Sequence, residues 1–179
     1  MPTSDTYATF ASGCFWCTEA VFKRVRGVSR VVPGYTGGTI DAPHYDDVSG
    51  GDTGHAEAIQ MTYDPAIIPY EQLVRIFFGT HDPTQLNRQG HDVGSQYRSA
   101  IFYHDGAQRT VAERVRDELN EAETFSAPIV TEIQPAGKFF EAEPYHHNYY
   151  ETNPDAPYCQ VVIDPKISQL RKSFQKWLV

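Results

Sequence analysis

Apolar and polar residues recur along this chain with two periods, and these predict a series of strands and helices. The clearest strand covers residues 57–63, where every second residue from Glu57 to Tyr63 falls on one face. The first helix is predicted over residues 14–26, because apolar residues recur there at intervals of three and four, and Gly27 follows as a stop signal. The chain therefore mixes both kinds of element.

The predicted elements of the first hundred residues follow the order strand, helix, strand, strand, helix, strand. The other members of this series are strands at residues 7–12, 28–35 and 97–104 and a helix at residues 69–80. This order is the split βαβ arrangement, with a sheet covered by helices on one face. We therefore predict an α+β, two-layer sandwich with a ferredoxin-like βαββαβ core and a mixed, mostly antiparallel sheet.

A C-terminal extension is predicted to follow this core. Its elements are a helix at residues 106–123, an edge strand at 129–134, a short aromatic helix at 144–151, an extended stretch at 160–163 and a helix at 168–178. Residues 39–54 and 81–96 are predicted to be polar loops. No linker rich in Gly, Ser or Pro divides the chain, so we expect one domain over residues 1–179.

Composition narrows the class of protein. The 179 residues carry a formal net charge of −8 and are 40% hydrophobic, which suits a packed core and argues against binding to nucleic acid. No apolar run approaches the roughly 20 residues of a membrane helix. Residues 1–6 lack the features of a signal peptide. We therefore expect a cytoplasmic monomer with no nucleic-acid or membrane partner.

The three cysteines, Cys14, Cys17 and Cys159, are too few for a disulfide framework. Cys14 follows a predicted strand and a glycine turn, at the start of the first helix. The helix N-terminus is expected to lower the pKa of its thiol and make it a nucleophile. The same spacing equally allows Cys14 and Cys17 to be core residues on the apolar stripe of the helix.

Three further residues are candidates for the same chemistry. Phe15 and Trp16 follow the thiol directly and are suited to an apolar pocket for a small methyl-bearing group. Glu57 shares a strand face with apolar residues, so desolvation is expected to raise its pKa and keep it protonated as a proton donor. The alternative is that Glu57 lies at the strand end and points into solvent.

The segment from His81 to Ser99 is dense in hydrogen-bonding groups, which is typical of a functional loop. Its His and Asp residues match no established zinc or iron spacing, and the single C-x-x-C pair supplies too few ligands for a structural zinc. We therefore expect neither a metal nor another cofactor.

The motif Gly-Cys-Phe-Trp-Cys at residues 13–17 resembles the signature of the peptide methionine sulfoxide reductase A family, which reduces methionine-S-sulfoxide. Further similar stretches, in the family's order, are residues 34–38, Tyr45 with Val48, residues 53–58, the loop from His81 through Arg98 and residues 144–150. The resemblance covers about residues 10–102 and resumes at residues 144–150.

The resemblance implies that Cys14 attacks the sulfoxide sulfur and that Glu57 protonates its oxygen. The other implied roles are hydrogen bonds to that oxygen from Tyr45 and Tyr97, a methyl pocket of Phe15 and Trp16, and ordering of the site by Asp92 through water or Tyr97. Cys14 becomes a sulfenic acid and then a disulfide, which a thioredoxin-like dithiol reduces. The substrate is methionine sulfoxide, free or in proteins.

The chain departs from the family at the second thiol. Many members have Gly at the position of Cys17 and use a cysteine near the C-terminus, whereas this chain has both Cys17 and Cys159. Cys17 lies one helical turn from Cys14 and can be bridged to it if that turn relaxes. Cys159 alternates with Val161 and Ile163, which predicts a buried strand face. We therefore expect Cys17 to resolve the sulfenic acid, with Cys159 as the alternative or as a third, shuttling thiol.

Two other functions remain open from the residues alone. A general thiol–disulfide oxidoreductase would use the C-x-x-C pair without any carboxylic acid, although the order of elements differs from that of thioredoxin. A metal-binding module would use the His-rich loops and the cysteine pair.

Overall fold

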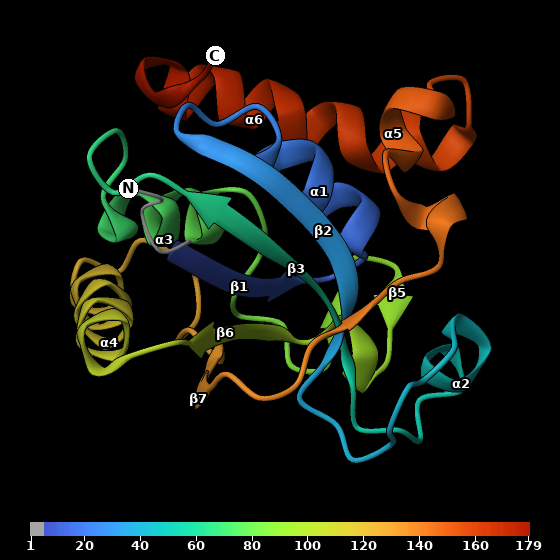
Figure 1. Cartoon of the computed structure of the whole chain (residues 1–179). Helices are drawn as coiled ribbons and strands as arrows, with labels where there is room; N and C mark the ends of the chain where they lie inside the picture. The colour runs from blue at the N-terminus through green and yellow to red at the C-terminus, as the bar shows by residue number, and fades with distance from the viewer. Residues whose placement is uncertain (1–5) are drawn as a thin grey trace, which may run out of the picture.

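The structure, a computed structural model that describes residues 6–179, is built around a six-stranded sheet in the order β7-β6-β1-β3-β2-β8 (Figure 1). The strands are β1 (Thr6–Ser12), β2 (Val28–Thr36), β3 (Ala56–Tyr63), β6 (Ser99–Tyr103), β7 (Glu132–Pro135) and β8 (Phe140–Glu141). Within the described residues, β6 and β7 run parallel and the other neighbours run antiparallel. The prediction of a mixed, mostly antiparallel sheet is confirmed.

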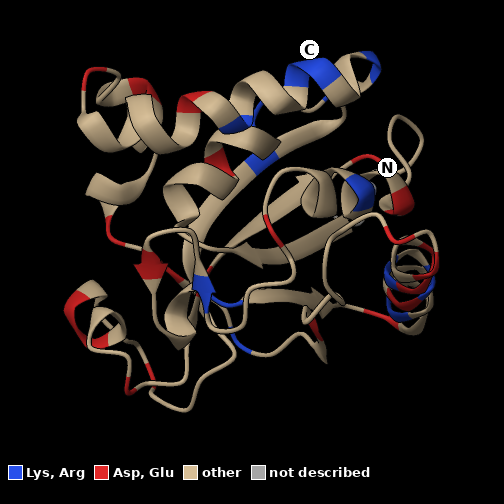
Figure 2. Ribbon diagram, turned by 180° about the vertical axis from the view of Figure 1, so that it is seen from behind, with Lys and Arg blue, Asp and Glu red and all other residues tan. Residues whose placement is uncertain are grey.

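The helices are α1 (Phe15–Phe22), α2 (Tyr45–Ser49), α3 (Tyr70–Gly79), α4 (Gly106–Glu121), α5 (Tyr149–Thr152) and α6 (Asp164–Phe174). The helices α1, α3 and α6 pack together beside the sheet. The outer helix α4 packs against α3 and β6 and contains charged residues of both signs (Figure 2). None of the helices within residues 6–179 combines the length and the hydrophobicity of a transmembrane span.

The main core lies between the sheet and the helices on one of its faces. Phe10 of β1 is fully buried, with its ring 5.4 Å from Phe22 of α1 and 5.0 Å from Phe77 of α3. The opposite face holds a second, smaller cluster of alanines with Phe102, covered by Ala136 and Phe139. The central strands β1 and β3 are therefore buried on both sides, and a carboxyl on β3 has little access to water.

The first helix ends earlier than its apolar pattern predicts. We expected it to run to residue 26, but α1 ends at Phe22. Beyond it, the Arg24 and Val25 N–H groups bond to carbonyls three residues back. The next N–H, of Arg26, donates to the Trp177 carbonyl, so pairing with the C-terminal segment replaces the helical hydrogen bond.

Both predicted loops contain short regular elements. Residues 39–54 include the five-residue helix α2. Residues 81–96 include a small hairpin of β4 (Arg88–Gln89) and β5 (Asp92–Val93), which turns at Gly90 with a φ of +60°. Elements of two to five residues are too short to show a period in the sequence.

The C-terminal segment differs most from its prediction. Residues 160–163, expected to be extended, belong to a helical turn, Cys159–Ile163, that leads directly into α6. Cys159 and Ile163 are buried, while Val161 between them is 71% exposed. The expectation that Cys159 lies on a buried strand face is therefore wrong. Residues buried four apart are typical of a helix, although over five residues the pattern also resembles an alternation.

Other predictions agree with the structure to within a few residues. The predicted edge strand at 129–134 corresponds to β7, and the predicted C-terminal helix begins earlier, at Asp164. The aromatic segment 144–151 is a 3-10 turn followed by α5, because Asn148 takes a left-handed conformation between them. The expectation about a signal peptide concerns residues 1–6, most of which lie outside the described residues.

Gly13 shapes the turn that brings the chain from β1 into α1. Its φ is +99°, and an added Cβ would lie 2.8 Å from the Cβ of Gln89. We expect Gly13→Ala to lower the free energy of unfolding by about 1–3 kcal/mol, because both backbone strain and this close contact oppose it. Urea unfolding checks the value. Gly106→Ala is the control, since a Cβ there meets no atom within 4 Å. Equal loss in the two variants would contradict the prediction.

Candidate active site

Cys14 stands at the junction of β1 and α1, as the residue that precedes the first turn of the helix. Its side chain is nearly buried, with 8% exposed. The carbonyl of Cys14 accepts the first hydrogen bonds of the helix, from the N–H groups of Cys17 and Thr18. The N–H of Phe15 remains free for another acceptor and donates to the carboxyl oxygen Oε1 of Glu57 at 3.1 Å.

Glu57 lies inside the sheet, opposite Tyr35 of β2, and only 1% of the residue is exposed. Burial raises the pKa of its carboxyl to about 8, against a weaker lowering by the Phe15 N–H. The carboxyl therefore keeps its proton near neutral pH, as expected for a residue on an apolar strand face. The alternative, that Glu57 points into solvent, is wrong.

The pKa of Cys14 differs from the expectation. The helix N-terminus was expected to lower it, yet burial raises the pKa of the thiol well above its usual value. The nearby Cys17 and Glu57 raise it further, whereas the Trp16 N–H favours the thiolate. In the substrate-free protein, Cys14 is therefore a thiol beside a protonated carboxyl.

Two tyrosine side chains belong to the same site. Tyr45 begins α2, and Tyr97 ends a 3-10 turn, Ser95–Tyr97, before β6. Burial and the neighbouring Glu57 raise the pKa of both phenols, that of Tyr45 to about 12. Both groups therefore keep their protons and can donate hydrogen bonds to an oxygen held near Glu57 and Cys14.

The two aromatics after Cys14 occupy different environments. Phe15 is fully buried, with its ring 5.6 Å from that of Tyr35. Trp16 is half-buried and stacks on Tyr149 of α5 at 3.7 Å, with 7° between the ring planes. Its indole N–H donates to Nδ1 of His146 at 3.0 Å, so the proton of the neutral imidazole is on Nε2. Sequence reasoning had identified Phe15 and Trp16 but not their aromatic neighbours.

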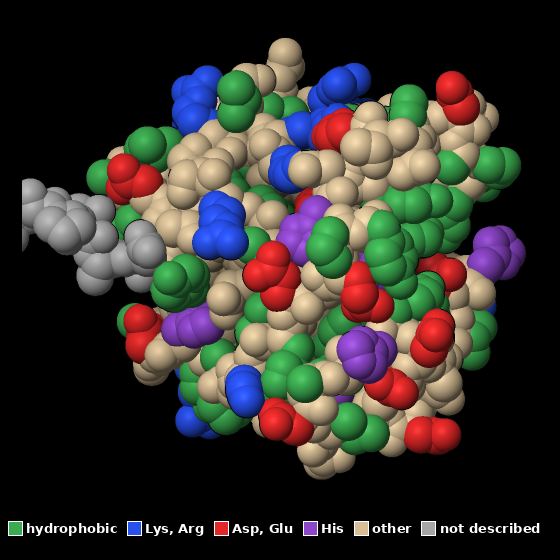
Figure 3. Space-filling model, turned by 45° about the vertical axis from the view of Figure 1, so that its right-hand side comes forward, with side chains coloured by type: hydrophobic (Ala, Val, Ile, Leu, Met, Phe, Trp, Pro, Cys, Tyr) green, Lys and Arg blue, Asp and Glu red, His purple; other side chains and the backbone are tan. Residues whose placement is uncertain are grey.

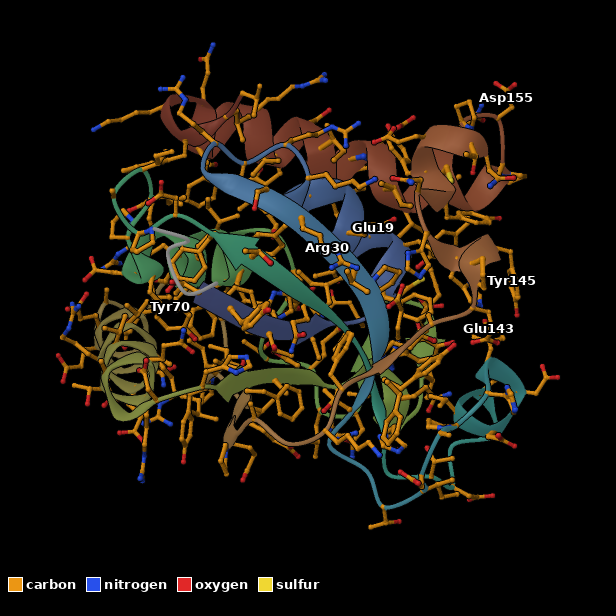
Figure 4. The ribbon with its side chains drawn as sticks, viewed as in Figure 1. Glu19, Arg30, Tyr70, Glu143, Tyr145 and Asp155 are labelled. Atoms are coloured by element: carbon orange, nitrogen blue, oxygen red, sulfur yellow. The ribbon has the colours of Figure 1, made fainter. Side chains whose placement is uncertain are left out.

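Glu143 connects α2 to the segment that leads to α5. One carboxyl oxygen accepts from the Tyr35 hydroxyl at 2.9 Å, and the other from the Tyr45 N–H at 3.0 Å. Glu143 and Tyr145 lie on this segment near α2 (Figure 4). The centre of the face turned forward in Figure 3 carries acidic and histidine side chains among hydrophobic ones. Glu143 thus fixes the start of the helix that carries Tyr45.

Asp92 has a hydrogen-bond partner that the sequence did not predict. Its Oδ2 accepts a hydrogen bond from the Tyr158 hydroxyl at 2.7 Å, and that hydroxyl lies 3.5 Å from Sγ of Cys17. Cys14, Cys17, Asp92 and Tyr158 line one pocket of about 640 Å³ together with Lys166. Asp92 is therefore placed beside the second cysteine, and its side chain accepts a hydrogen bond from Tyr158.

All three cysteines are free thiols in the structure, and all are buried. Cys159 lies in the turn that precedes α6, packs in the main core and has no exposed surface. It is close enough to Cys17 for that thiol to contribute to the raised pKa of Cys159. The fold therefore brings together the three cysteines that sequence reasoning proposed for successive steps.

Several residues of the site escaped sequence reasoning. The sequence contains one indication of Tyr158: it directly precedes the candidate thiol Cys159. His146 and Tyr149 lie within residues 144–150, which resemble the family. For Glu143 and Lys166, no spacing or motif gave a signal. Within the described part of the chain, no cluster of three or more His, Cys, Asp or Glu side chains is placed to hold a metal ion.

The site combines a buried thiol at a helix start, a protonated carboxyl bonded to the same helix turn and an aromatic wall. This combination suits a thiol-dependent oxidoreductase. The sequence pattern of the family described as peptide methionine sulfoxide reductase matches residues 6–178. The chain belongs to this family, and the resemblance, the enzyme class and the thiol-dependent reduction of methionine sulfoxide expected from the sequence are confirmed.

Relatives support this membership over nearly the whole chain. The peptide methionine sulfoxide reductase MsrA of Chromobacterium violaceum is 52% identical over 171 residues, which cover 96% of this chain and 97% of that protein. The MsrA of Deinococcus radiodurans is 53% identical over 167 residues, which cover 93% of this chain and 81% of that protein.

Solved structures share the mixed α/β fold. Mxr1 from Saccharomyces cerevisiae in reduced form superposes with a TM-score of 0.80 at 36% identity, covering 89% of this chain and 91% of that one. Mxr1 was also solved in complex with Trx2, and that structure matches with a TM-score of 0.56 at 26% identity, covering 83% of this chain and 87% of the other.

Proposed function

We propose that this protein reduces methionine-S-sulfoxide, free or in proteins, with Cys14 as nucleophile and Glu57 as general acid. The observation that carries the assignment is the hydrogen bond from the Phe15 N–H to the buried Glu57 carboxyl, directly beside the Cys14 thiol. A carboxyl that keeps its proton to a pH of about 8 is suited to protonate a departing oxygen, a step that sulfoxide reduction requires and thiol–disulfide exchange does not.

The protons of the first step balance within this pair. Sulfoxide oxygen leaves sulfur only when protonated, and Glu57 supplies that proton. The resulting Glu57 carboxylate takes the thiol proton of Cys14 as the Cys14 sulfur attacks the sulfoxide sulfur. The hydroxyl group then passes from the substrate sulfur to the Cys14 sulfur: a Cys14 S–O bond forms, the substrate S–O bond and the new S–S bond break, and the electron pair of the S–S bond stays on the sulfur of methionine. Cys14 becomes a sulfenic acid, and methionine departs. The net transfer is one proton from Cys14 to the oxygen, which explains how a thiol with a raised pKa can react.

The other expected roles complete the proposal. Tyr45 and Tyr97 donate hydrogen bonds to the sulfoxide oxygen, a role supported by the protons that both phenols retain. Phe15 and Trp16 contact the methyl group, with Trp16 held in place by Tyr149. Asp92 helps to order the site through water or Tyr97, and its hydrogen bond from Tyr158 also links it to the second cysteine.

We propose Cys17 as the thiol that condenses with the sulfenic acid. It shares a pocket with Cys14, whereas Cys159 has no exposed surface and its thiol pKa is raised by burial. Cys159 is the alternative and would serve as a shuttling thiol. A thioredoxin-like dithiol reduces the disulfide, and the complex of yeast Mxr1 with Trx2 supports this partner.

A disulfide map after one turnover without reductant tests the resolving thiol. We expect a Cys14–Cys17 bridge in the wild type and accumulated sulfenic acid in Cys17→Ser, detected by mass spectrometry after trapping with dimedone. Cys159→Ser is the matched control and is expected to form the first bridge normally. A Cys14–Cys159 bridge formed at the wild-type rate in Cys17→Ser would reject Cys17.

Three further expectations concern the fold, the domain organisation and the cellular location. We assign the core β1-α1-β2-β3-α3-β6 to the ferredoxin-like arrangement, supported by the neighbour order β6-β1-β3-β2. Residues 1–179 act as one domain, with the residues after β6 as its C-terminal extension. A cytoplasmic location is supported by the three free cysteines, since thiols persist in a reducing compartment.

A further inference from the structure

A hydrogen-bonded chain leads from Cys17 to a carboxylate. The hydroxyl of Tyr158 lies 2.7 Å from Oδ2 of Asp92 and 3.5 Å from Sγ of Cys17. Tyr158 has one hydroxyl proton, and the hydroxyl donates it to Asp92. The phenol oxygen then has a lone pair free for the S–H of Cys17.

The position of Tyr158 is fixed from a second side. Its ring meets the indole of Trp16 edge to face, with centroids 5.7 Å apart and 81° between the planes. It stands immediately before the turn that contains Cys159. The hydroxyl is therefore held between the two elements that carry Asp92 and Cys17.

The other titratable groups that act on Cys17 come from five different places in the fold. They are Cys14 before α1, Glu57 of β3, Asp92 of β5, Cys159 in the turn before α6, and Lys166 of α6. Among them, Lys166 is the cation: it donates to the Thr80 carbonyl at 3.0 Å and lines the same pocket. A negative charge formed on Cys17 therefore faces one ammonium group as well as the Tyr158 hydroxyl.

We propose that Tyr158 is a proton-transfer residue for the resolving step, and that it passes the proton of Cys17 to Asp92 as Cys17 attacks the sulfenic acid of Cys14. This inference rests on the proposed role of Cys17 as the resolving thiol. It assigns a function to Tyr158, and it makes Asp92 the acceptor of the proton that Tyr158 passes on.

The step balances as follows in atoms and electrons. The Cys17 proton moves to the Tyr158 oxygen while the Tyr158 proton moves to Asp92. An electron pair of the Cys17 sulfur forms the S–S bond, and the S–O bond of Cys14 breaks with its pair on oxygen. The departing hydroxyl takes up the proton held by Asp92, which lines the same pocket, and leaves as water. The sulfenic sulfur is reduced and the Cys17 sulfur is oxidised, so no further reagent is needed.

Rapid mixing of the reduced full-length protein with a methionine-S-sulfoxide peptide tests the proposal. Methionine release reports the first step, and loss of dimedone-reactive sulfenic acid reports the second. In Tyr158→Phe, we expect unchanged methionine release and disulfide formation slowed by about tenfold or more near neutral pH. The slowing should shrink at alkaline pH, where hydroxide removes the Cys17 proton. Asp92→Asn is expected to give the same pH-dependent slowing.

Tyr150→Phe is the matched control, because it removes a tyrosine hydroxyl that donates to another carboxylate, Asp164. It should leave both steps unchanged. A wild-type rate of disulfide formation in Tyr158→Phe, or a slowing that is equal at every pH, would overturn the proposal.

The Cys17→Ser variant separates this failure from a failure of the proposed function. If Cys17→Ser stalls at the sulfenic acid while Tyr158→Phe behaves as wild type, only the role of Tyr158 is wrong. If Cys17→Ser forms a disulfide at the wild-type rate, the resolving role of Cys17 fails and the inference is overturned with it.

Discussion

Cys14→Ser should lower the rate of methionine-S-sulfoxide reduction by roughly 10³-fold or more, because it removes the proposed nucleophile. A serine hydroxyl is far less acidic than a thiol and is a poor nucleophile toward sulfur. Serine and cysteine are nearly isosteric, and Cys14 is 8% exposed, so the substitution should leave the fold intact. Methionine formed from a sulfoxide peptide with excess dithiol is the measurement.

A control variant separates loss of chemistry from loss of a thiol in general. Cys159→Ser removes a buried cysteine without touching the first step, and its methionine release in a single turnover should match the wild type. Substantial sulfoxide reduction by purified Cys14→Ser would show that another group attacks the substrate.

Glu57→Gln should lower the rate of methionine release by roughly 10²-fold or more, since an amide cannot donate its proton to the sulfoxide oxygen. In the proposed reaction the protonated carboxyl is the active form, and its pKa is about 8. Wild-type single-turnover rates should therefore fall as the pH rises through about 8. The residual rate of the variant should not fall over this pH range. If the rate of Glu57→Gln falls with pH as the wild-type rate does, another group is responsible for the pH dependence.

Although Glu57→Gln should lower activity, it should raise the stability of the fold at alkaline pH. Because the pKa of Glu57 rises from 4.5 to about 8 on folding, the folded state binds this proton more tightly than the unfolded state. Its contribution to stability is therefore lost as the pH rises from 4.5 to about 8. Each pKa unit corresponds to about 1.4 kcal/mol, so Glu57→Gln should be the more stable protein by a few kcal/mol at alkaline pH.

Urea unfolding at several pH values checks this effect. The glutamine keeps an oxygen that can accept from the Phe15 N–H, so the comparison isolates the ionisation. A Glu57→Gln variant whose stability follows the same pH curve as the wild type would contradict the raised pKa. A catalytic acid maintained at a cost in stability is a common compromise at active sites.

The periodic parts of the sequence predicted the fold well. Strands such as residues 57–63 have a strict alternation, and this pattern placed Glu57 on the apolar face where the structure has it. The turn Cys159–Ile163 could not be identified in this way, because five residues are compatible with either period. Short elements that are stabilised by distant partners leave no local signal.

The site was predictable where its residues are close in sequence. Cys14, Phe15 and Trp16 are contiguous, and the motif that contains them led to the family. The link between Asp92 and Tyr158 joins residues 66 positions apart, so only the fold reveals it. The pKa of Cys14 was predicted in the wrong direction, because local position shows the helix terminus but not the degree of burial.

The contacts of Trp16 give the protein an optical probe at its own site. The indole stacks on Tyr149, bonds to His146 and meets the edge of Tyr158, so its emission depends on the arrangement of all three. The other tryptophan, Trp177, lies in the turn after α6, beside Lys176. A fluorescence change that disappears in Trp16→Phe and persists in Trp177→Phe therefore reports on the site. It follows the reactions of Cys14 and Cys17 in real time and without a label.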